Sequence, residues 1–169
     1  MIHLDDLRRE ATVATAPTVC MHCDDPACAS VCPADAIHKG PDGVVHTAMT
    51  ERCIGCSNCV LACPFGVPKY DSRLDQMMKC DLCYDRTSRD LAPMCATVCP
   101  SGALFYGTAE TIENDRRARP VGAFQFGKEV VQTKVRYLVP PHVETVTVSA
   151  PHDELLRSRA ELCLEEALC

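Results

Sequence analysis

The sequence lacks tryptophan and is poor in the other aromatic residues, with four phenylalanines and four tyrosines among 169 residues. Aromatic side chains supply much of the buried area of ordinary cores, so we expect no large conventional hydrophobic core. Long apolar runs are missing too. None approaches the roughly 20 residues of a transmembrane helix, which predicts no direct membrane insertion. The first residues show no basic start followed by an apolar stretch, which is the pattern of a signal peptide. We therefore favour a cytoplasmic location, and export together with a partner that carries a signal is the alternative.

Positive charge is also scarce in this sequence. Seventeen Lys and Arg residues against 23 Asp and Glu residues give a formal net charge of −6. A nucleic-acid-binding surface needs a basic patch, so we expect no nucleic-acid partner. The sequence contains neither a nucleophile beside a general base nor a glycine-rich phosphate loop, which favours a non-catalytic protein. Its length allows one domain or two very small ones.

Cysteine is the residue that the sequence has in excess, with 14 in 169 residues. Twelve of them fall into three groups of four, and Cys163 and Cys169 lie in the tail. Dense two-residue spacing suits a metal centre, whereas disulfide scaffolds separate their cysteines so that distant pairs can meet. Structural zinc sites use two separated pairs, and the middle group has one cysteine too many for that. We therefore expect iron–sulfur clusters, with zinc or a disulfide framework as the alternatives.

The middle group reads Cys53-Ile-Gly-Cys56-Ser-Asn-Cys59-Val-Leu-Ala-Cys63-Pro64. This spacing is typical of bacterial ferredoxins, in which three thiolates hold one 4Fe–4S cluster and the fourth reaches a neighbouring cluster. Gly55 is expected to relieve crowding where the chain passes close to the inorganic sulfides. Pro64 fixes its own φ and redirects the chain after the fourth cysteine.

The other two groups repeat this run with insertions. The first is Cys20-Met-His-Cys23-Asp-Asp-Pro-Ala-Cys28-Ala-Ser-Val-Cys32-Pro33. The third is Cys80-Asp-Leu-Cys83, an eleven-residue insertion, and Cys95-Ala-Thr-Val-Cys99-Pro100. Such a repeat predicts an α+β fold of duplicated bacterial-ferredoxin-like cluster-binding units. Each unit is expected to contain a cluster loop, a short helix opened by the last cysteine, and a strand.

The pattern divides the chain into an N-terminal segment (1–19), a cluster-binding region (20–107) and a C-terminal strand-and-helix extension for partner docking (108–169). Residues 5–10 are expected to form a turn of helix. Strands are expected at 44–46, 104–106 and 145–148, and paired strands at 124–131 and 133–139. Helices are expected within 108–119 and in the tail, where Cys163 lies on an apolar face.

The three groups, in this order and with these insertions, resemble the iron–sulfur electron-transfer subunits of molybdopterin oxidoreductases, the family serving dimethyl-sulfoxide, nitrate, polysulfide and formate enzymes. The resemblance rests on residues 20–28, 53–64, 78–86 and 95–107. It implies a relay of single electrons through about three 4Fe–4S clusters. The implied partners are a large molybdopterin-containing (Mo/W) catalytic subunit and a further redox or membrane-anchor subunit. A free-standing polyferredoxin, or a small subunit of a hydrogenase or carbon-monoxide dehydrogenase, would use the same chemistry. A zinc-stapled interaction module is the alternative from another class.

The resemblance also implies ligand sets. The family usually carries four cysteine groups, and this sequence has no counterpart of the first. The two central groups of the family exchange their last cysteines. Carried over, one cluster takes Cys20, Cys23, Cys28 and Cys63, and a second takes Cys53, Cys56, Cys59 and Cys32. A third takes Cys80, Cys83 and Cys95, with Cys99, a tail cysteine (Cys163 or Cys169) or a partner's ligand as the fourth; a three-iron or open site is the other outcome.

Two further residues lie close to these ligands. His22 lies between two cysteines of the first group and is expected to hydrogen-bond within its loop. Lys79 directly precedes the third group. It is expected either to donate toward cluster sulfur, which would raise a reduction potential, or to remain solvated.

Overall fold

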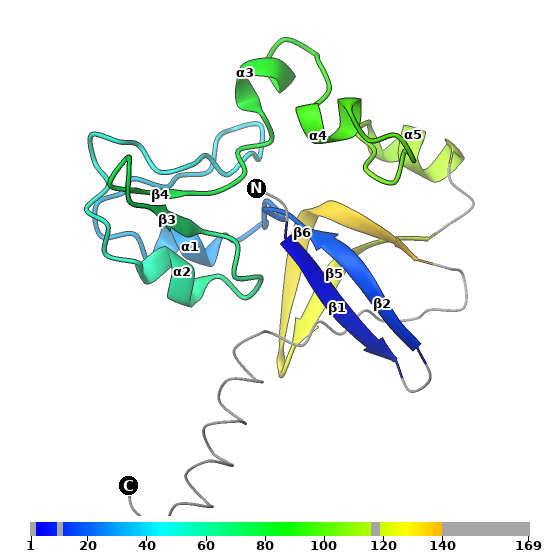
Figure 1. Ribbon diagram of the computed structural model, residues 1–169, viewed down its shortest axis with the longest axis horizontal. Coiled ribbons are helices and arrows are strands. Elements are labelled where there is room, and N and C mark those ends of the chain that lie inside the picture. Colours follow the sequence, from blue (N-terminus) through cyan, green and yellow to red (C-terminus); the bar gives the residue numbers. More distant parts are fainter. Residues whose placement is uncertain (1–2, 10–11, 116–118, 140–169) are drawn as a thin grey trace, which may run out of the picture.

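The computed structural model describes residues 3–9, 12–115 and 119–139. Within them, three two-stranded antiparallel sheets alternate along the chain with short helices (Figure 1). The strands are β1 His3–Arg9, β2 Thr12–Thr18, β3 Lys69–Asp71, β4 Gln76–Met78, β5 Arg119–Phe126 and β6 Glu129–Val139. The helices are α1 Ala27–Ser30, α2 Asn58–Ala62, α3 Tyr84–Thr87, α4 Met94–Thr97 and α5 Ala109–Asp115. In this described part of the chain, no helix combines the length and apolarity needed to cross a membrane.

The N-terminal hairpin shows that the expected turn of helix at residues 5–10 is wrong. β1 pairs with β2 in an antiparallel register that runs from His3 opposite Thr18 to Arg9 opposite Thr12. β2 is rich in β-branched residues, which favour strands, and it gives the polar β1 segment a partner. The Tyr137 hydroxyl of β6 donates to the carbonyl of Pro17 at 3.2 Å, so the first and last described hairpins are joined.

The hairpin β5–β6 confirms paired strands in this region, but the expected bounds of 124–131 and 133–139 are wrong. The hairpin turn falls inside the first expected strand, and residues 133–139 form the second half of β6, which pairs back to β5 as far as Arg119. Helix α5 confirms a helix within 108–119. A two-residue turn joins the strands, and its first position is Gly127 with φ +59°. That conformation is accessible to glycine at little cost and matches the twist of a tight hairpin. The strand expected at 145–148 and the tail helix with Cys163 and Cys169 lie outside the described residues.

The short helices lie before the last cysteine of each group and not after it, so the expected order was wrong. α2 holds Cys59 and ends at Ala62, and Cys63 is extended with ψ 112°. A residue that precedes proline is driven out of the helical region, and Pro64 imposes this on Cys63. The strands expected at 44–46 and 104–106 are also absent from the described chain, where Val45 makes only an isolated bridge with Lys39.

The core is divided into two small clusters, in agreement with the scarcity of aromatic residues. In the first, Phe65 meets Phe124 and Phe126 edge to face, with ring centroids 5.6 and 5.0 Å apart. Tyr137 meets Phe124 in the same way at 5.3 Å, and Cys20 is buried beside these rings. The second cluster contains no aromatic side chain and packs with the middle cysteine group; its buried members are Ala36, Ile37, Val45, Ala48, Cys59 and Met77.

Strand β6 binds the first cysteine loop through the backbone. The N–H of Lys134 donates to the carbonyl of His22, and the N–H of Val135 donates to the carbonyl of Met21, both at 3.2 Å. The hairpin therefore covers one side of this loop and completes the aromatic core behind it. The cysteine loops and α1 to α4 extend from this end of the molecule (Figure 1).

This packing predicts that Phe124→Ala destabilises the protein by about 3–5 kcal/mol, because a fully buried ring is replaced by a cavity. Phe124 is 0% exposed, whereas Val130 on the same hairpin is 57% exposed. Val130→Ala is therefore the matched control, with an expected change below about 0.5 kcal/mol. Anaerobic denaturant titrations followed by circular dichroism measure both. Equal, small changes in the two variants would contradict the packing described.

Candidate metal centres

Four cysteines line one pocket in the middle of the cysteine region. Cys53, Cys56 and Cys59 of the middle group share it with Cys32 of the first group. The pKa of the Cys59 thiol is raised, first by burial and then by neighbouring thiols that include Cys56, Cys32 and Cys53. The structure thus brings together the four residues expected to hold the second cluster.

Backbone N–H groups point at two sulfurs of this middle site. The N–H of Ala36 donates to Sγ of Cys32 at 3.2 Å, and that of Met77 donates to Sγ of Cys53 at 3.4 Å. Burial alone would raise the pKa of Cys32, but the backbone N–H groups of its own loop outweigh burial and lower it. Donors of this kind stabilise thiolates, the form that binds iron, and were not foreseen from the sequence.

The first site is more deeply buried. Burial is the main reason that the pKa of Cys23 is raised to about 12, with Cys20, Cys63 and Cys28 as the next causes. Burial likewise raises the pKa of Cys28 to about 11, with Lys79 opposing the shift and Cys20 and Cys63 adding to it. Cys63 belongs to the middle group, so the structure also brings together the four residues expected to hold the first cluster.

The donor sets of these two sites fit 4Fe–4S clusters. Several buried thiols that face one another cannot all ionise without cations between them, because like charges repel strongly in a low dielectric. A metal-bound thiol is deprotonated outright, so iron removes this penalty. None of the twelve described cysteines forms a disulfide. Within the described residues, no three His, Cys, Asp or Glu side chains are arranged to hold a single metal ion.

The third group brings three of its four cysteines together. The pKa of Cys95 is raised by burial and by the thiols of Cys80 and Cys83. The Cys99 sulfur instead lies within hydrogen-bonding distance of the Ser101 hydroxyl and accepts from the N–H of Leu104, each at 3.5 Å. These contacts within its own loop lower the pKa of Cys99 to about 7.

The backbone repeats itself where the chain wraps each site. The residue before the second cysteine has a positive φ in all three groups: 46° at His22, 66° at Gly55 and 63° at Leu82. A Cβ on Gly55 would make only an ordinary 3.5 Å contact with Tyr70. Glycine supplies the required conformation there at little cost, and its expected role in relieving crowding against cluster sulfides stays a prediction.

A second repeated turn follows each last cysteine. Its third residue donates its N–H to the carbonyl of that cysteine, at 3.2 Å from Asp35, 3.0 Å from Gly66 and 3.2 Å from Gly102. All three residues have positive φ, of 47°, 60° and 63° respectively. Superposing the three sequence groups on their Cys-Pro pairs would have indicated this position, since two of the three residues are glycine.

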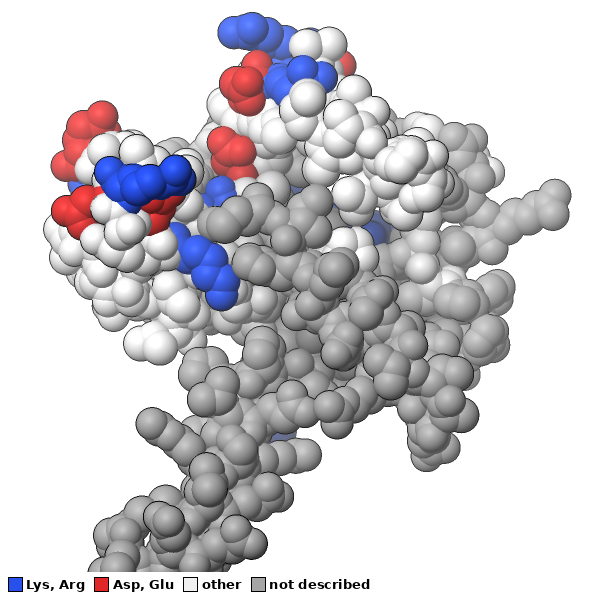
Figure 2. All heavy atoms as spheres, in the orientation of Figure 1, with Lys and Arg blue, Asp and Glu red and all other residues white. Residues whose placement is uncertain are grey.

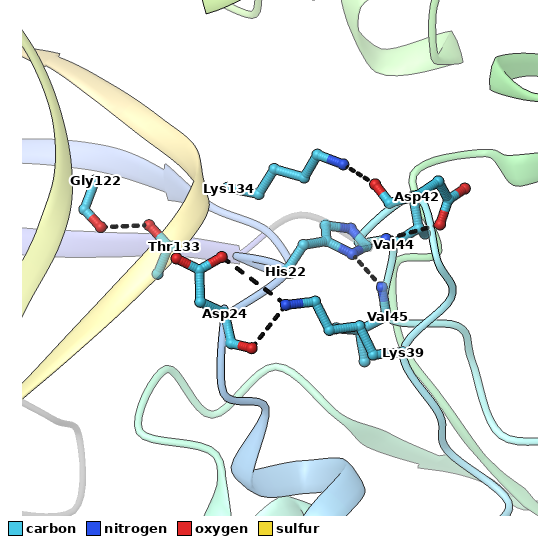
Figure 3. A network of polar contacts seen from close by, with 9 residues as sticks. All are labelled: His22, Asp24, Lys39, Asp42, Val44, Val45, Gly122, Thr133 and Lys134. Carbon is cyan, nitrogen blue, oxygen red and sulfur yellow. Dashed lines mark hydrogen bonds and ion pairs between the residues drawn. The ribbon is translucent and has the colours of Figure 1, made fainter.

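His22 makes the loop hydrogen bond expected of it. Its ring is 1% exposed and points at Val45, whose N–H donates to Nδ1 at 3.0 Å (Figure 3). Burial first, and then the positive charge of Lys79, lowers the pKa of His22 to about 3. A neutral imidazole is the form that can accept this bond. On the other side of the ring, Lys134 donates to the carbonyl of Asp42.

Comparisons with known proteins identify the family to which the cysteine region belongs. A family model described as a 4Fe-4S dicluster domain matches residues 11–109. One subunit of the anaerobic dimethyl sulfoxide reductase of Escherichia coli strain K12 is 45% identical over 93 residues, which are 55% of this chain and 45% of that relative. The formate dehydrogenase-O iron–sulfur subunit of the same strain is 41% identical over 95 residues, 56% of this chain and 31% of the relative.

A third relative matches a longer part of the chain. The hydrogenase-2 operon protein HybA of Escherichia coli O157:H7 is 36% identical over 144 residues, which are 79% of this chain and 42% of HybA. The chain spans less than half the length of each of these three relatives. The family match covers more than half of the chain and includes all three cysteine groups. The chain therefore belongs to the 4Fe-4S dicluster domain family, and subunits of a dimethyl sulfoxide reductase and of a formate dehydrogenase are among its relatives.

Proposed function

We propose that the chain is a non-catalytic subunit that relays single electrons through 4Fe–4S clusters between a large molybdopterin-containing catalytic subunit and a second redox partner. The crossing of two cysteines carries this proposal. Cys32 lies with the middle site and Cys63 with the first, so the two sites share the segments that hold them. Because each site takes a cysteine from the segment that holds the other, the two sites lie close together, and an electron relay requires such short distances between centres. The clusters supply the redox chemistry, and the chain positions them and tunes their potentials.

The names of two relatives support the partner. One is part of a dimethyl sulfoxide reductase and the other is the iron–sulfur subunit of a formate dehydrogenase. Exposed apolar side chains near the third group would suit a docked partner: Leu91, Met94 and Val98 are 49%, 48% and 64% exposed. Figure 2 shows mostly uncharged side chains on the described surface around α4, with charged groups gathered at the projecting ends of the cysteine region.

A second candidate function is the same relay in a hydrogenase complex. The match to HybA covers 79% of this chain, a larger share than the 55% and 56% of the other two relatives. The identity of the catalytic partner separates the two candidates, because the cluster chemistry is common to both.

Purification of the tagged chain from its own cells under anaerobic conditions tests the function. We expect a brown protein with about four irons per cluster that bleaches on reduction, together with a large pterin-containing chain. Hydrogen oxidation by the purified complex would instead favour the second candidate. A stable monomeric carrier without a large partner would contradict both, and a colourless protein without iron would support a zinc module.

We further propose that two ligand sets cross between groups: Cys20, Cys23, Cys28 and Cys63 hold one cluster, and Cys53, Cys56, Cys59 and Cys32 hold the other. Cys32→Ser is then expected to alter the same electron paramagnetic resonance (EPR) signal as Cys59→Ser. Cys63→Ser is expected to alter a different signal, although Cys63 and Cys59 belong to one sequence group. If Cys32→Ser changed the signal that Cys63→Ser changes, the crossing would be wrong.

The third site is proposed to rest on Cys80, Cys83 and Cys95, with its fourth ligand from outside the group. The Cys99 sulfur makes its strongest interactions with groups of its own loop. The Cys32 sulfur likewise accepts backbone hydrogen bonds from its own loop, and we assign it to the neighbouring site. The three repeated turns after the last cysteines support duplicated ferredoxin-like units in which last cysteines are lent to a neighbour.

Replacing Cys99 by Ser is therefore expected to leave the iron content of the chain unchanged, whereas Cys95→Ser removes the third cluster. Iron and sulfide assays on anaerobic protein measure both variants, and each is compared with the unaltered chain. Loss of one whole cluster in Cys99→Ser would show that the third group closes its own site and would contradict this assignment.

A further inference from the structure

Lys79 is a buried lysine between two of the cysteine sites. It follows β4, directly precedes Cys80 and is only 6% exposed. The solvated alternative for this side chain is therefore wrong. Lysine is rarely buried to this degree, because taking an ammonium group out of water costs several kcal/mol unless other groups compensate.

Three acceptors surround the Lys79 amine. Nζ donates to the carbonyl of Val45, to the carbonyl of Cys80 at 3.1 Å, and to Sγ of Cys20 at 3.6 Å. An ammonium group has three N–H bonds and no lone pair, so three acceptors match its charged form. The ion pairs in the described part of the chain do not include Lys79. Negative charge to compensate it is available from neighbouring cysteines, which become thiolates when they bind iron.

Those thiolates belong to two different sites. Cys20, which Lys79 contacts, and Cys28, on which its charge acts, belong to the first set. Cys80 belongs to the third set, and both Cys20 and Lys79 also influence the pKa of its thiol, after burial as the main cause. The strongest influences on Cys59 come instead from burial and its own site. The cysteines that the Lys79 amine contacts, Cys20 and Cys80, therefore belong to the first and third sites.

The position of the amine is fixed from both ends. The backbone N–H of Lys79 donates to the Thr47 hydroxyl at 3.3 Å. Its acceptor Val45 is itself held to the first cysteine loop, since the N–H of Val45 donates to His22 at 3.0 Å. A cation held at a defined distance from two sites gives each of them a constant electrostatic effect.

We propose that Lys79 is a shared buried cation that raises the reduction potentials of the first and third clusters relative to the middle one. Reduction adds one negative charge to a cluster, and a nearby cation stabilises the reduced form more than the oxidised form. The N–H···S contact with Cys20 acts in the same direction and favours a larger effect on the first cluster. Lys79 would thus tune the reduction potentials of the clusters without itself binding iron or carrying electrons. The inference rests on the proposed function only in that clusters must occupy these sites.

Redox titration followed by EPR spectroscopy tests this role in the full chain, prepared anaerobically with complete iron content. Lys79→Met removes the charge but keeps most of the apolar length. We expect the signals of the first and third clusters, identified through Cys23→Ser and Cys95→Ser, to titrate at lower potential and the middle signal to stay unchanged. Unshifted first and third potentials in a fully loaded variant would overturn the proposal.

The matched control is Lys39→Met. Lys39 donates to the carbonyl of Asp24, next to Cys23, but its side chain is 29% exposed and its ion pair with Asp24 lies at the surface. The same loss of charge near the same loop is expected to leave all three potentials unchanged. A shift as large as that of Lys79→Met would show that net charge alone acts, which contradicts a specific role for the buried amine.

A second variant tests the proposal if Lys79→Met does not assemble its clusters. Lys79→Gln keeps an N–H donor for the Val45 carbonyl and removes the charge, so its potentials are read in the same way. If both variants lose iron, loss confined to the first and third clusters supports a cation shared by those two sites, and equal loss from all three contradicts it. Absence of any cluster signal from the unaltered chain would refute the proposed function itself, which is a distinguishable result.

Discussion

The structure depends on bringing mutually repelling thiols together inside the protein. Burial and neighbouring thiols raise the pKa of Cys23 to about 12, so these groups resist ionisation until a metal compensates them. The two apolar cores are small, and each includes cysteines of a site. Metal binding by such a chain supplies folding free energy, because the preformed site does not exist in the unfolded state. The clusters and the fold are therefore expected to be lost together.

The crossed cysteines turn a linear repeat into a connected structure. If every group closed its own site, each loop could move independently of the next. With Cys32 beside the middle group and Cys63 beside the first, each site requires the other loop in place. The hairpin β5–β6 adds to this constraint, since it binds the first loop through backbone hydrogen bonds and places Phe124 behind Phe65. Proximity of the two sites follows from the fold and needs no separate interaction.

The sequence predicted the features that depend on local pattern and spacing. These include α5 and the presence of paired strands near the end of the described chain, although the turn between β5 and β6 was misplaced. It failed where a neighbour decides the outcome: β1 is a strand because β2 pairs with it, and α2 ends at Ala62 because proline follows Cys63. The positive φ of Leu82 had no signal of its own, since leucine rarely adopts it. The burial of Lys79 depends on Val45 and Cys20, which are 34 and 59 residues away in the chain.

The contrast between surface and buried charge explains how an acidic protein can give its centres different potentials. Exposed charges are screened by solvent and salt, so the net charge of −6 acts weakly on every site. A buried ammonium acts through a lower dielectric, and its effect falls with distance. Lys79 contacts the Cys20 sulfur and lies next to Cys80, so it distinguishes the first and third sites from the middle one. One internal cation of this kind would therefore act on some sites more strongly than on others, which the surface charge cannot do.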